Sequence, residues 1–285
     1  MKNFLLMILL FVSFLSCGQA KPTLTLLKGM KKVYVTEMTG EVPGQDAIHM
    51  TLEQQYEVVD ETPDGYVLDI QVNSLKKDDK NPPGMSFSTA MNIMEGKHCQ
   101  YEMDKEGKVL RSLSIDEVKE QYRENYLSFH EFSPHETDTI ATKMVEEMKE
   151  QDLESLKNAI SPLALNGKDI TDGKEEEFCD ANGFKMKRKF RIKTNGSIQS
   201  KSTINMKAED IKELYLQMFK KLGLGVTDDA RKNIDEMVKN FNMDYSEEAT
   251  YTFLPDGWVK TIDCVITKKD TQSAPVTLTY KVHIK

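Results

Sequence analysis

The chain has 285 residues, of which 39% are hydrophobic and 29% charged, and its formal net charge is -8. A chain of this length can form one large domain or two smaller ones with a substantial core. The acidic balance argues against nucleic acid as a partner and against broad adhesion to anionic lipid.

The first residues have the pattern of a secretory signal. Lys2 supplies a basic start, residues 4–15 form an apolar run, and Ser16 then precedes Cys17. The apolar run is shorter than the roughly 20 residues that a membrane-spanning helix needs. We therefore expect residues 1–16 to be a signal peptide that is removed.

The end of this signal, Phe14-Leu15-Ser16-Cys17, resembles the lipobox of bacterial lipoproteins. Phe14 and Leu15 depart from the usual pattern, which has leucine and then a small residue at these positions. The resemblance implies that Cys17 becomes the mature N-terminus and carries acyl chains such as palmitate, which anchor the protein to a membrane of the bacterial cell envelope. The protein would then face the periplasm or the cell surface. The alternative is a plain secretory peptide that is cut nearby, for instance after Ala20.

Alternating apolar and polar residues predict antiparallel strands in the first half of the chain. They cover residues 23–42 and 48–75, and the second of these stretches reverses at the Pro-Asp-Gly turn of residues 63–65. Residues 98–113 predict another hairpin, which turns at residues 104–107.

A basic stretch at residues 185–193 opens the second set of strands. Its alternation places Met186, Arg188, Phe190 and Ile192 on one face and mostly lysines on the other. We interpret it as a strand with a solvated basic face, and not as a nucleic-acid site.

The remaining strands follow from turn signals. The pair Asn195-Gly196 predicts a hairpin between the basic strand and residues 197–206. Residues 249–269 contain a second Pro-Asp-Gly turn, and residues 275–285 alternate to the end of the chain.

Helical periodicity and capping residues predict four helices, at residues 115–129, 134–160, 208–222 and 227–241, the last capped by Thr227. We therefore expect an α+β protein, in which antiparallel sheet from both ends of the chain packs against about four helices from the middle.

The expected domain organisation follows from this order. A lipid-anchored linker of residues 17–24 leads into a strand-rich half with helices at residues 25–160. The second half, residues 161–285, has a hairpin, two helices and strands. The two halves could equally form one domain over residues 25–285.

No metal or cofactor site is predicted. His130 and His135 are the best metal candidates, but they are five residues apart with a proline between them, whereas a zinc-protease pair needs a spacing of four. The methionines at helical spacing, such as Met144, Met148 and Met237, indicate core packing and not copper binding.

No catalytic residue is predicted either. The chain has neither the GxSxG nor the HExxH motif. Cys99, Cys179 and Cys264 have no CxxC spacing, so we expect buried thiols or one disulfide. The histidines in predicted strands, His49 and His98 among them, have ordinary structural explanations.

The chain is similar to uncharacterised lipoproteins of Gram-negative bacteria, whose function is unknown. The similarity lies in Cys17, in residues 101–117 and in residues 162–178. In architecture alone, the expected fold is similar to that of periplasmic lipoprotein carriers, whose curved sheets wrap acyl chains around a helical plug.

These patterns favour a non-catalytic function, which is binding of a hydrophobic ligand or an envelope protein through a concave sheet face or a helical edge. The residues expected to line that face are Val33, Val35, Tyr66, Leu68, Phe190 and Ile192. Simple burial in a core explains the same residues. The alternative function is an envelope hydrolase with an unrecognised carboxylate site, which would require a deep acid-lined cleft.

If Cys17 carries the anchor, Cys17→Ala should move the protein from the membrane fraction to the soluble fraction. Cell fractionation followed by immunoblotting measures this. A variant that stays in the membrane fraction would show that Cys17 is not the anchor.

Overall fold

The computed structural model describes residues 18–77, 96, 98–113, 156, 158–179, 185–221, 226–271 and 273–285. Eleven strands form one antiparallel sheet in the order β6-β5-β4-β3-β2-β13-β12-β11-β10-β9-β8. A small second sheet pairs β1 (Gln19–Ala20) with β7 (Ile170–Thr171).

In chain order, the strands of the large sheet are β2 (Lys31–Glu41), β3 (Ile48–Thr62), β4 (Gly65–Lys77), β5 (His98–Asp104), β6 (Val109–Ser112), β8 (Glu175–Cys179), β9 (Lys185–Ile192), β10 (Ile198–Lys207), β11 (Asn242–Phe253), β12 (Val259–Asp270) and β13 (Val276–Ile284). The sheet joins both halves of the chain, because β2 pairs with β13.

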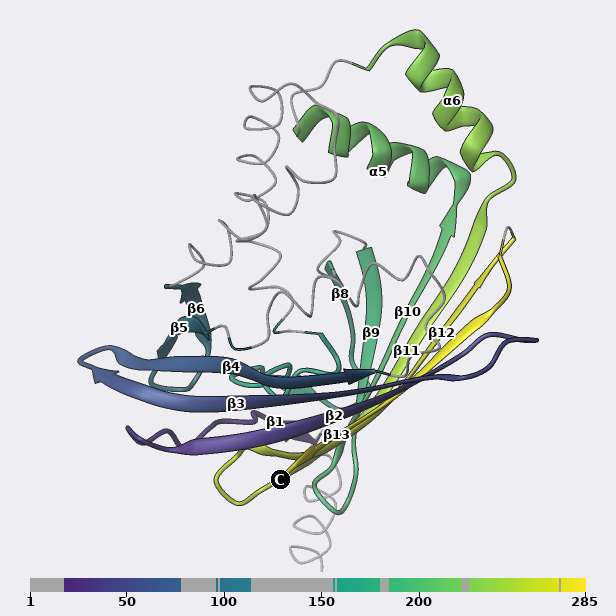
Figure 1. Ribbon diagram of the computed structural model, residues 1–285. Coiled ribbons are helices and arrows are strands. Elements are labelled where there is room, and N and C mark those ends of the chain that lie inside the picture. Colours follow the sequence, from purple (N-terminus) through teal and green to yellow (C-terminus); the bar gives the residue numbers. More distant parts are fainter. Residues whose placement is uncertain are drawn as a thin grey trace, which may run out of the picture.

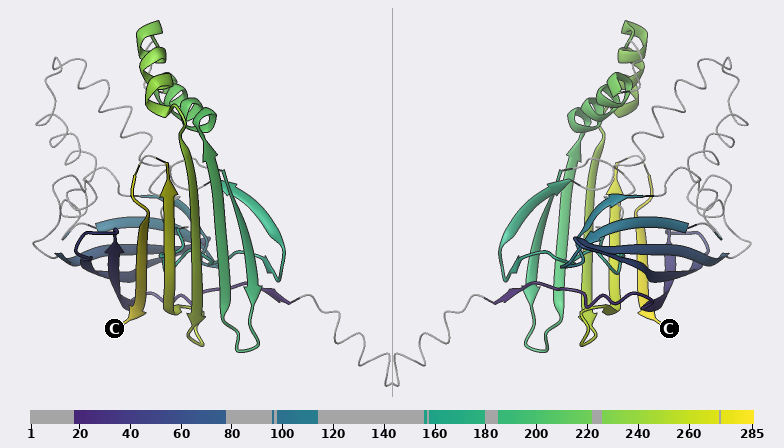
Figure 2. Two further views of the ribbon diagram at one scale, coloured as in Figure 1. Left: turned by 90° about the vertical axis from the view of Figure 1, so that its right-hand side faces the viewer. Right: turned by 90° about the vertical axis from the view of Figure 1, so that its left-hand side faces the viewer.

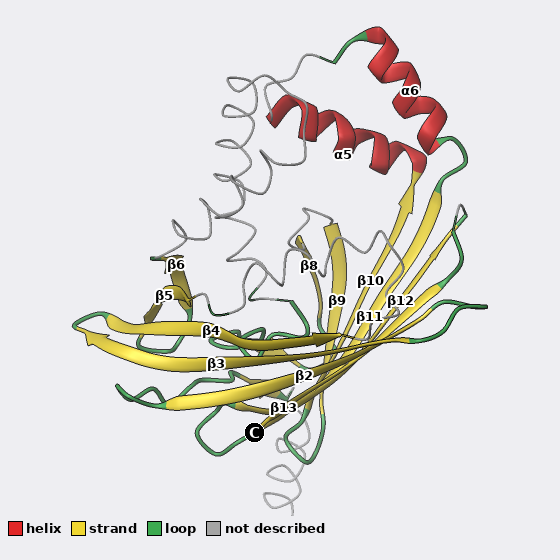
Figure 3. Ribbon diagram, in the orientation of Figure 1, coloured by secondary structure: helices red, strands yellow, loops and turns green. Residues whose placement is uncertain are grey.

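The expected α+β fold with about four covering helices is wrong. Strands make up 56% of the described residues, which contain two helices, α5 (Ala208–Lys221) and α6 (Asp228–Val238). These helices lie beyond the ends of β10 and β11 and do not cover the sheet (Figure 3). The error arose because helical periodicity predicts that a helix forms but does not determine which surface it packs against.

The two predicted helices near residues 208–241 are confirmed, and the Thr227 hydroxyl accepts a hydrogen bond from Ala230 N at 3.2 Å as the expected cap. Met237, however, is 48% exposed, so the prediction that it lies in the core is wrong. The predicted helix at 115–129 and most of the one at 134–160 lie outside the described residues; residues 158–160 form turns and bends. No described helix is long and apolar enough to cross a membrane.

All four predicted hairpins are confirmed. β3 pairs with β4, β5 with β6, β9 with β10, and β11 with β12. Gly107, Gly196 and Gly257 have positive φ in three of the turns, a conformation that glycine adopts without a steric penalty.

The sheet is strongly twisted and bent, so that β2–β4 and β9–β12 run in very different directions (Figures 1 and 2). Ala249, Cys264, Tyr280, Met38 and Met50 are opposite one another on five successive strands, and all are buried. Side chains opposite one another in a sheet share a face. We call this buried face the inner face and the opposite one the outer face.

Aromatic side chains form the centre of the core on the inner face. Trp258 is fully buried, and its ring centroid is 6.4 Å from that of Tyr56, which is in turn 5.3 Å from that of Tyr34. Both contacts are edge-to-face, a favourable geometry for aromatic rings. The Tyr34 hydroxyl donates to the Val259 carbonyl at 2.7 Å, which ties β2 to the start of β12.

The first described residues pack against this core. Asp172 N donates to Gly18 O, Gly167 N to Pro22 O, and Thr25 N to Asp256 O, each at 2.8 Å. Leu24 and Leu26, which follow in sequence, are buried in the same core. From Gly18 onward, therefore, the chain is hydrogen-bonded to the folded protein.

Two of the three cysteines beyond Cys17 can be placed. Cys99 and Cys264 are buried thiols that form no disulfide with each other. Burial raises the pKa of the Cys264 thiol to about 12. The side chain of Cys179 lies outside the described residues.

Substitution of Gly257 can test how closely the N-terminal segment packs against the turn between β11 and β12. A Cβ at this position would lie 1.9 Å from the Thr23 carbonyl oxygen, whereas a Cβ at Gly44, which also has positive φ, would meet nothing within 4 Å. Gly44→Ala should therefore cost only the conformational strain of about 1–2 kcal/mol. Gly257→Ala should cost more, on the order of 3 kcal/mol. Urea unfolding of the anchorless Cys17→Ala protein measures both, and equal losses would contradict this packing.

Candidate functional site

The inner face is apolar across most of the sheet. Every second side chain of each strand lies on this face, because successive residues of a strand point to opposite faces. Its buried apolar residues include Ile48, Met50, Tyr56, Leu68, Ile70, Tyr101, Met103, Phe190, Ile198, Tyr251, Ile262 and Val282.

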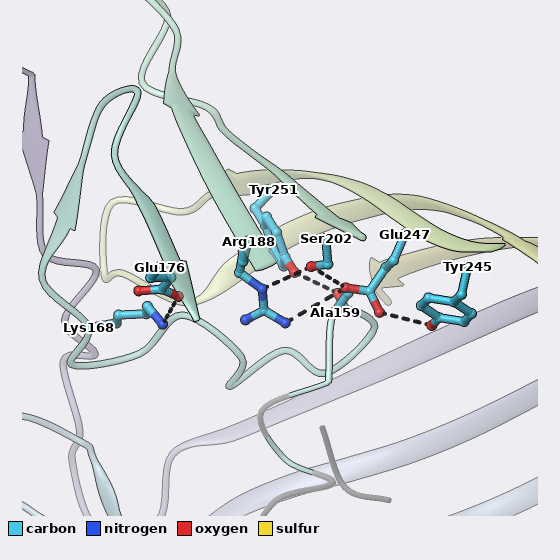
Figure 4. A network of polar contacts seen from close by, with 8 residues as sticks. All are labelled: Ala159, Lys168, Glu176, Arg188, Ser202, Tyr245, Glu247 and Tyr251. Atoms are coloured by element: carbon cyan, nitrogen blue, oxygen red, sulfur yellow. Dashed lines mark hydrogen bonds and ion pairs between the residues drawn. The ribbon is translucent and has the colours of Figure 1, made fainter. Parts of the chain in front are cut away.

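A polar row interrupts this apolar face on β9, β10 and β11. In the strand register, Arg188 is opposite Ser202, which is opposite Glu247. The three residues are 5%, 0% and 8% exposed. Because full burial of charged residues is rare unless they are paired, this row is the most unusual feature of the inner face. Figure 4 shows it from close by.

The serine hydroxyl bridges the two charged groups. Arg188 Nε donates to Ser202 Oγ at 3.0 Å, and Ser202 Oγ donates to Glu247 Oε1 at 3.1 Å. Arg188 Nη2 is 3.7 Å from Glu247 Oε1, which is an ion-pair contact but too long for a hydrogen bond. The arginine and the glutamate therefore attract each other without a direct hydrogen bond.

Aromatic groups surround the row. The Arg188 guanidinium carbon is 3.8 Å from the Phe178 ring centroid and 6.0 Å from that of Phe190, so the arginine makes cation–π contacts in a partly apolar setting. On the other side, the Tyr245 hydroxyl donates a long hydrogen bond of 3.5 Å to Glu247 Oε2.

Two further polar groups lie near the row. The Tyr251 hydroxyl donates to the Ala159 carbonyl at 2.9 Å, and burial raises the pKa of this tyrosine. Lys168 forms an ion pair with Glu176 at 2.5 Å and lies 5.3 Å from the centroid of the Phe190 ring. The segment that contains Ala159 and Lys168 therefore contacts the inner face beside the Arg188 row.

The outer face is polar. Arg191, Gln199, Thr250, Asp263 and Lys281 lie opposite one another on five successive strands. They line a shallow groove of about 550 Å³. This confirms the prediction that the basic side of β9 is solvated, and it distinguishes the outer face chemically from the inner one.

The outer face has its own buried acid. Asp69 Oδ2 lies 2.6 Å from His98 Nδ1, while Asp69 Oδ1 is buried without a hydrogen-bond partner. Asp69 and Glu247 are the buried carboxylates of the described residues, and they lie on opposite faces of the sheet. They form no carboxylate pair of the kind the hydrolase hypothesis requires. The described residues also contain no group of three or more His, Cys, Asp or Glu that could hold a metal.

The structure separates the six residues that we expected to line a binding face. Tyr66, Leu68, Phe190 and Ile192 lie on the inner face. Val33 and Val35 are opposite Gln55 and Glu53 and lie on the outer face, where both are half-buried. Cys17, His130 and His135 lie outside the described residues.

Sequence reasoning did not single out Arg188 or Glu247. A signal was available for both, because each occupies an apolar position in an alternating strand. Arg188 is between Met186 and Phe190 on the buried side of β9, and Glu247 precedes Ala249 on β11. A charge in the apolar register of a strand predicts a buried polar group that needs a partner.

No known family profile matches the sequence, and no curated protein matches it. Among solved structures, lipovitellin, in a study of its lipid–protein interactions, has a TM-score of 0.41 and 10% identity. The match covers 92% of this chain, which spans only a quarter, 25%, of the lipovitellin chain.

Two further structures were found. DynF of the dynemicin pathway of Micromonospora chersina has a TM-score of 0.22 and 5% identity, over 95% of this chain and 85% of DynF. A porin-like protein from Bacteroides uniformis has a TM-score of 0.18 and 10% identity, over 93% of this chain and 100% of that protein. At these TM-scores, none of the three similarities supports an inference about fold or function.

Removing one member of the buried pair should be costly. Arg188→Met removes the guanidinium that faces the buried carboxylate of Glu247 and should destabilise the protein by roughly 3–5 kcal/mol. Arg188→Met/Glu247→Gln removes both charges and should be less destabilising than the single variant. Arg191→Met, on the outer face of the same strand, should change the stability by less than about 0.5 kcal/mol. Urea unfolding measures all three, and a harmless Arg188→Met would contradict the pairing.

Proposed function

We propose that this chain is a lipid-anchored protein of the bacterial cell envelope that binds a hydrophobic ligand, without catalysis, on the inner face of its bent sheet. The observation that carries the proposal is the division of one continuous sheet into an apolar inner face and a polar outer face. A structural core explains much of the same apolar surface, and the polar Arg188 row within it is a second feature that supports binding.

Small-molecule sites are usually apolar surfaces with a few fixed polar groups that orient the ligand. The inner face has this composition, since the Arg188 row lies among Phe178, Phe190 and Tyr251. A ligand with an apolar body and one polar end would match both parts. An acyl-chain amphiphile is the simplest ligand of this kind.

The proposed lipid anchor and the proposed location in the cell envelope are both inferred from the sequence of residues 1–17. If Cys17 is acylated, the acyl chains are attached one residue before Gly18, whose carbonyl oxygen accepts a hydrogen bond from Asp172 N. The folded body would then lie close to the membrane surface. A protein held there has direct access to amphiphiles of that membrane or to apolar segments of an envelope partner.

The proposal predicts different effects of neighbouring substitutions on β12. Ile266 lies on the inner face opposite Glu247, whereas Val265 lies on the outer face and is exposed. Ile266→Asn should weaken binding of the apolar fluorescent probe N-phenyl-1-naphthylamine at least about tenfold, because a polar group then occupies the apolar face. Val265→Asn should leave it unchanged.

Native mass spectrometry of Cys17→Ala protein, purified gently from periplasm, provides a second readout. An acyl-containing adduct that Ile266→Asn removes and Val265→Asn retains would support ligand binding. If the Cys17→Ala protein has only the mass of the polypeptide and also binds no probe, ligand binding on the inner face is contradicted. A partner protein would then be the better candidate for binding to this face.

A further inference from the structure

Positive charge is concentrated on the outer side of β9. The outer positions of this strand and the first residue after it are all basic: Lys185, Lys187, Lys189, Arg191 and Lys193. All of these side chains are exposed. We call them the basic row. The whole chain has a formal net charge of -8, so the row is a local reversal of the overall charge.

The shallow groove of the outer face continues this positive charge beyond β9. Its charged lining consists of the cations Lys189, Arg191, Lys201 and Lys281 and the acids Glu248 and Asp263. Lys201 forms an ion pair with Glu248. The structure shows no ion pair between Lys189, Arg191 or Lys281 and any other described residue. The groove therefore has positive charge that its own acids do not neutralise.

The strand register also brings like charges together. Lys189 lies directly opposite Lys201 on β10, an arrangement that destabilises a sheet. Glu175 lies opposite Lys189 on the other side, but its carboxylate oxygen contacts Lys187 Nζ, at 3.7 Å. An anionic surface over the groove would relieve the repulsion between the two lysines.

The basic row ends beside the first described residue. A Cβ on Gly18 would lie 3.7 Å from Cδ1 and 3.9 Å from Cβ of Ile192, the residue between Arg191 and Lys193. Ile192 N donates to Asp172 Oδ1 at 2.8 Å, and Asp172 N donates to Gly18 O at 2.8 Å. In Figure 2, β1 accordingly lies at the end of the sheet opposite α6. Acyl chains on Cys17 would thus enter a membrane within a few residues of the basic row.

We propose that the outer face of β9 to β13 lies against the membrane that holds the anchor. The basic row and the cations of the groove would contact the head groups of its anionic phospholipids. This inference rests on the proposed anchor for the identity of the membrane, and it is independent of ligand binding on the inner face.

The range of electrostatic attraction explains how an acidic protein can do this. Basic residues are attracted to an anionic bilayer only within about one Debye length, which is roughly 10 Å at 0.1 M salt. The acidic residues on other surfaces lie further away and are screened. The overall charge argues against broad adhesion to anionic lipid, but a basic face beside the anchor can set the orientation of the protein.

The length of the basic row favours a membrane over a small anion. Alternate side chains of a strand are roughly 7 Å apart, so the row from Lys185 to Arg191 extends over roughly 20 Å. A small anion contacts one or two such side chains, whereas a bilayer surface meets all of them. In this orientation the inner face would lie on the other side of the sheet, roughly 10 Å further from the head groups.

Sedimentation with vesicles tests the proposal without the anchor. Cys17→Ala protein is mixed with vesicles of phosphatidylcholine alone, or of phosphatidylcholine with about 40% phosphatidylglycerol, in about 0.05 M NaCl. We expect the protein to bind only to the vesicles that contain phosphatidylglycerol. This binding should be lost in about 0.5 M NaCl, because salt screens the attraction.

Substitutions locate the surface that binds. Lys189→Gln/Arg191→Gln should weaken vesicle binding at least about tenfold, since each basic residue near an anionic surface contributes roughly fivefold. The matched control Lys232→Gln/Lys239→Gln removes the same charge from exposed positions in α6 and at its C-terminal cap, and should change binding by less than about twofold. Asp263→Asn removes an acid from the groove and should strengthen binding.

Two results would overturn the proposal. One is the absence of binding to phosphatidylglycerol vesicles at low salt, and the other is an equal loss in the two double variants. Either would leave the basic row as the solvated side of β9.

Ile266→Asn, on the inner face, distinguishes this inference from the proposed ligand binding. It should weaken probe binding and leave vesicle binding unchanged. If the protein binds the probe but not the vesicles, the membrane orientation is wrong and ligand binding stands. If it binds the vesicles but not the probe, the membrane orientation stands and ligand binding is wrong.

Discussion

Continuous backbone hydrogen bonding across eleven strands is the interaction on which the rest of the structure depends. Each strand pairs with its neighbours in antiparallel register, so side chains opposite one another share a face from β8 to β6. The pairing of β2 with β13 joins the two ends of the chain within this ladder. As a result, apolar side chains from distant segments form one inner face, and charged side chains form one outer face.

This ladder also explains why the Arg188 row is buried. The register places Met186 and Phe190 in the core. Because every second residue of a strand lies on the same face, Arg188 lies on that face too. Ser202 and Glu247 are brought to it by the pairing of β10 with β9 and β11. The register thus holds charged groups in apolar surroundings, where they cost free energy when they are unsatisfied.

The N-terminal segment connects the sheet to the proposed anchor. Residues 18–26 are hydrogen-bonded to the segment before β8 and to the turn between β11 and β12, and Trp258 donates to the Thr25 carbonyl. Under the proposed function, acyl chains on Cys17 would hold this end of the core at a membrane. The inner face would then lie close to the amphiphiles of that membrane.

Local patterns in the sequence by themselves determined the strands, their hairpin turns and the helices after β10, because alternation, Pro-Asp-Gly and Asn-Gly turns and capping residues act over a few positions. They also placed Phe190 and Ile192 together. Only the tertiary structure decided that the strands form one sheet, that Val33 lies on the opposite face from Leu68, and that Arg188 meets Glu247. These outcomes depend on pairing between strands far apart in the chain, and on register, where a shift of one residue exchanges the two faces.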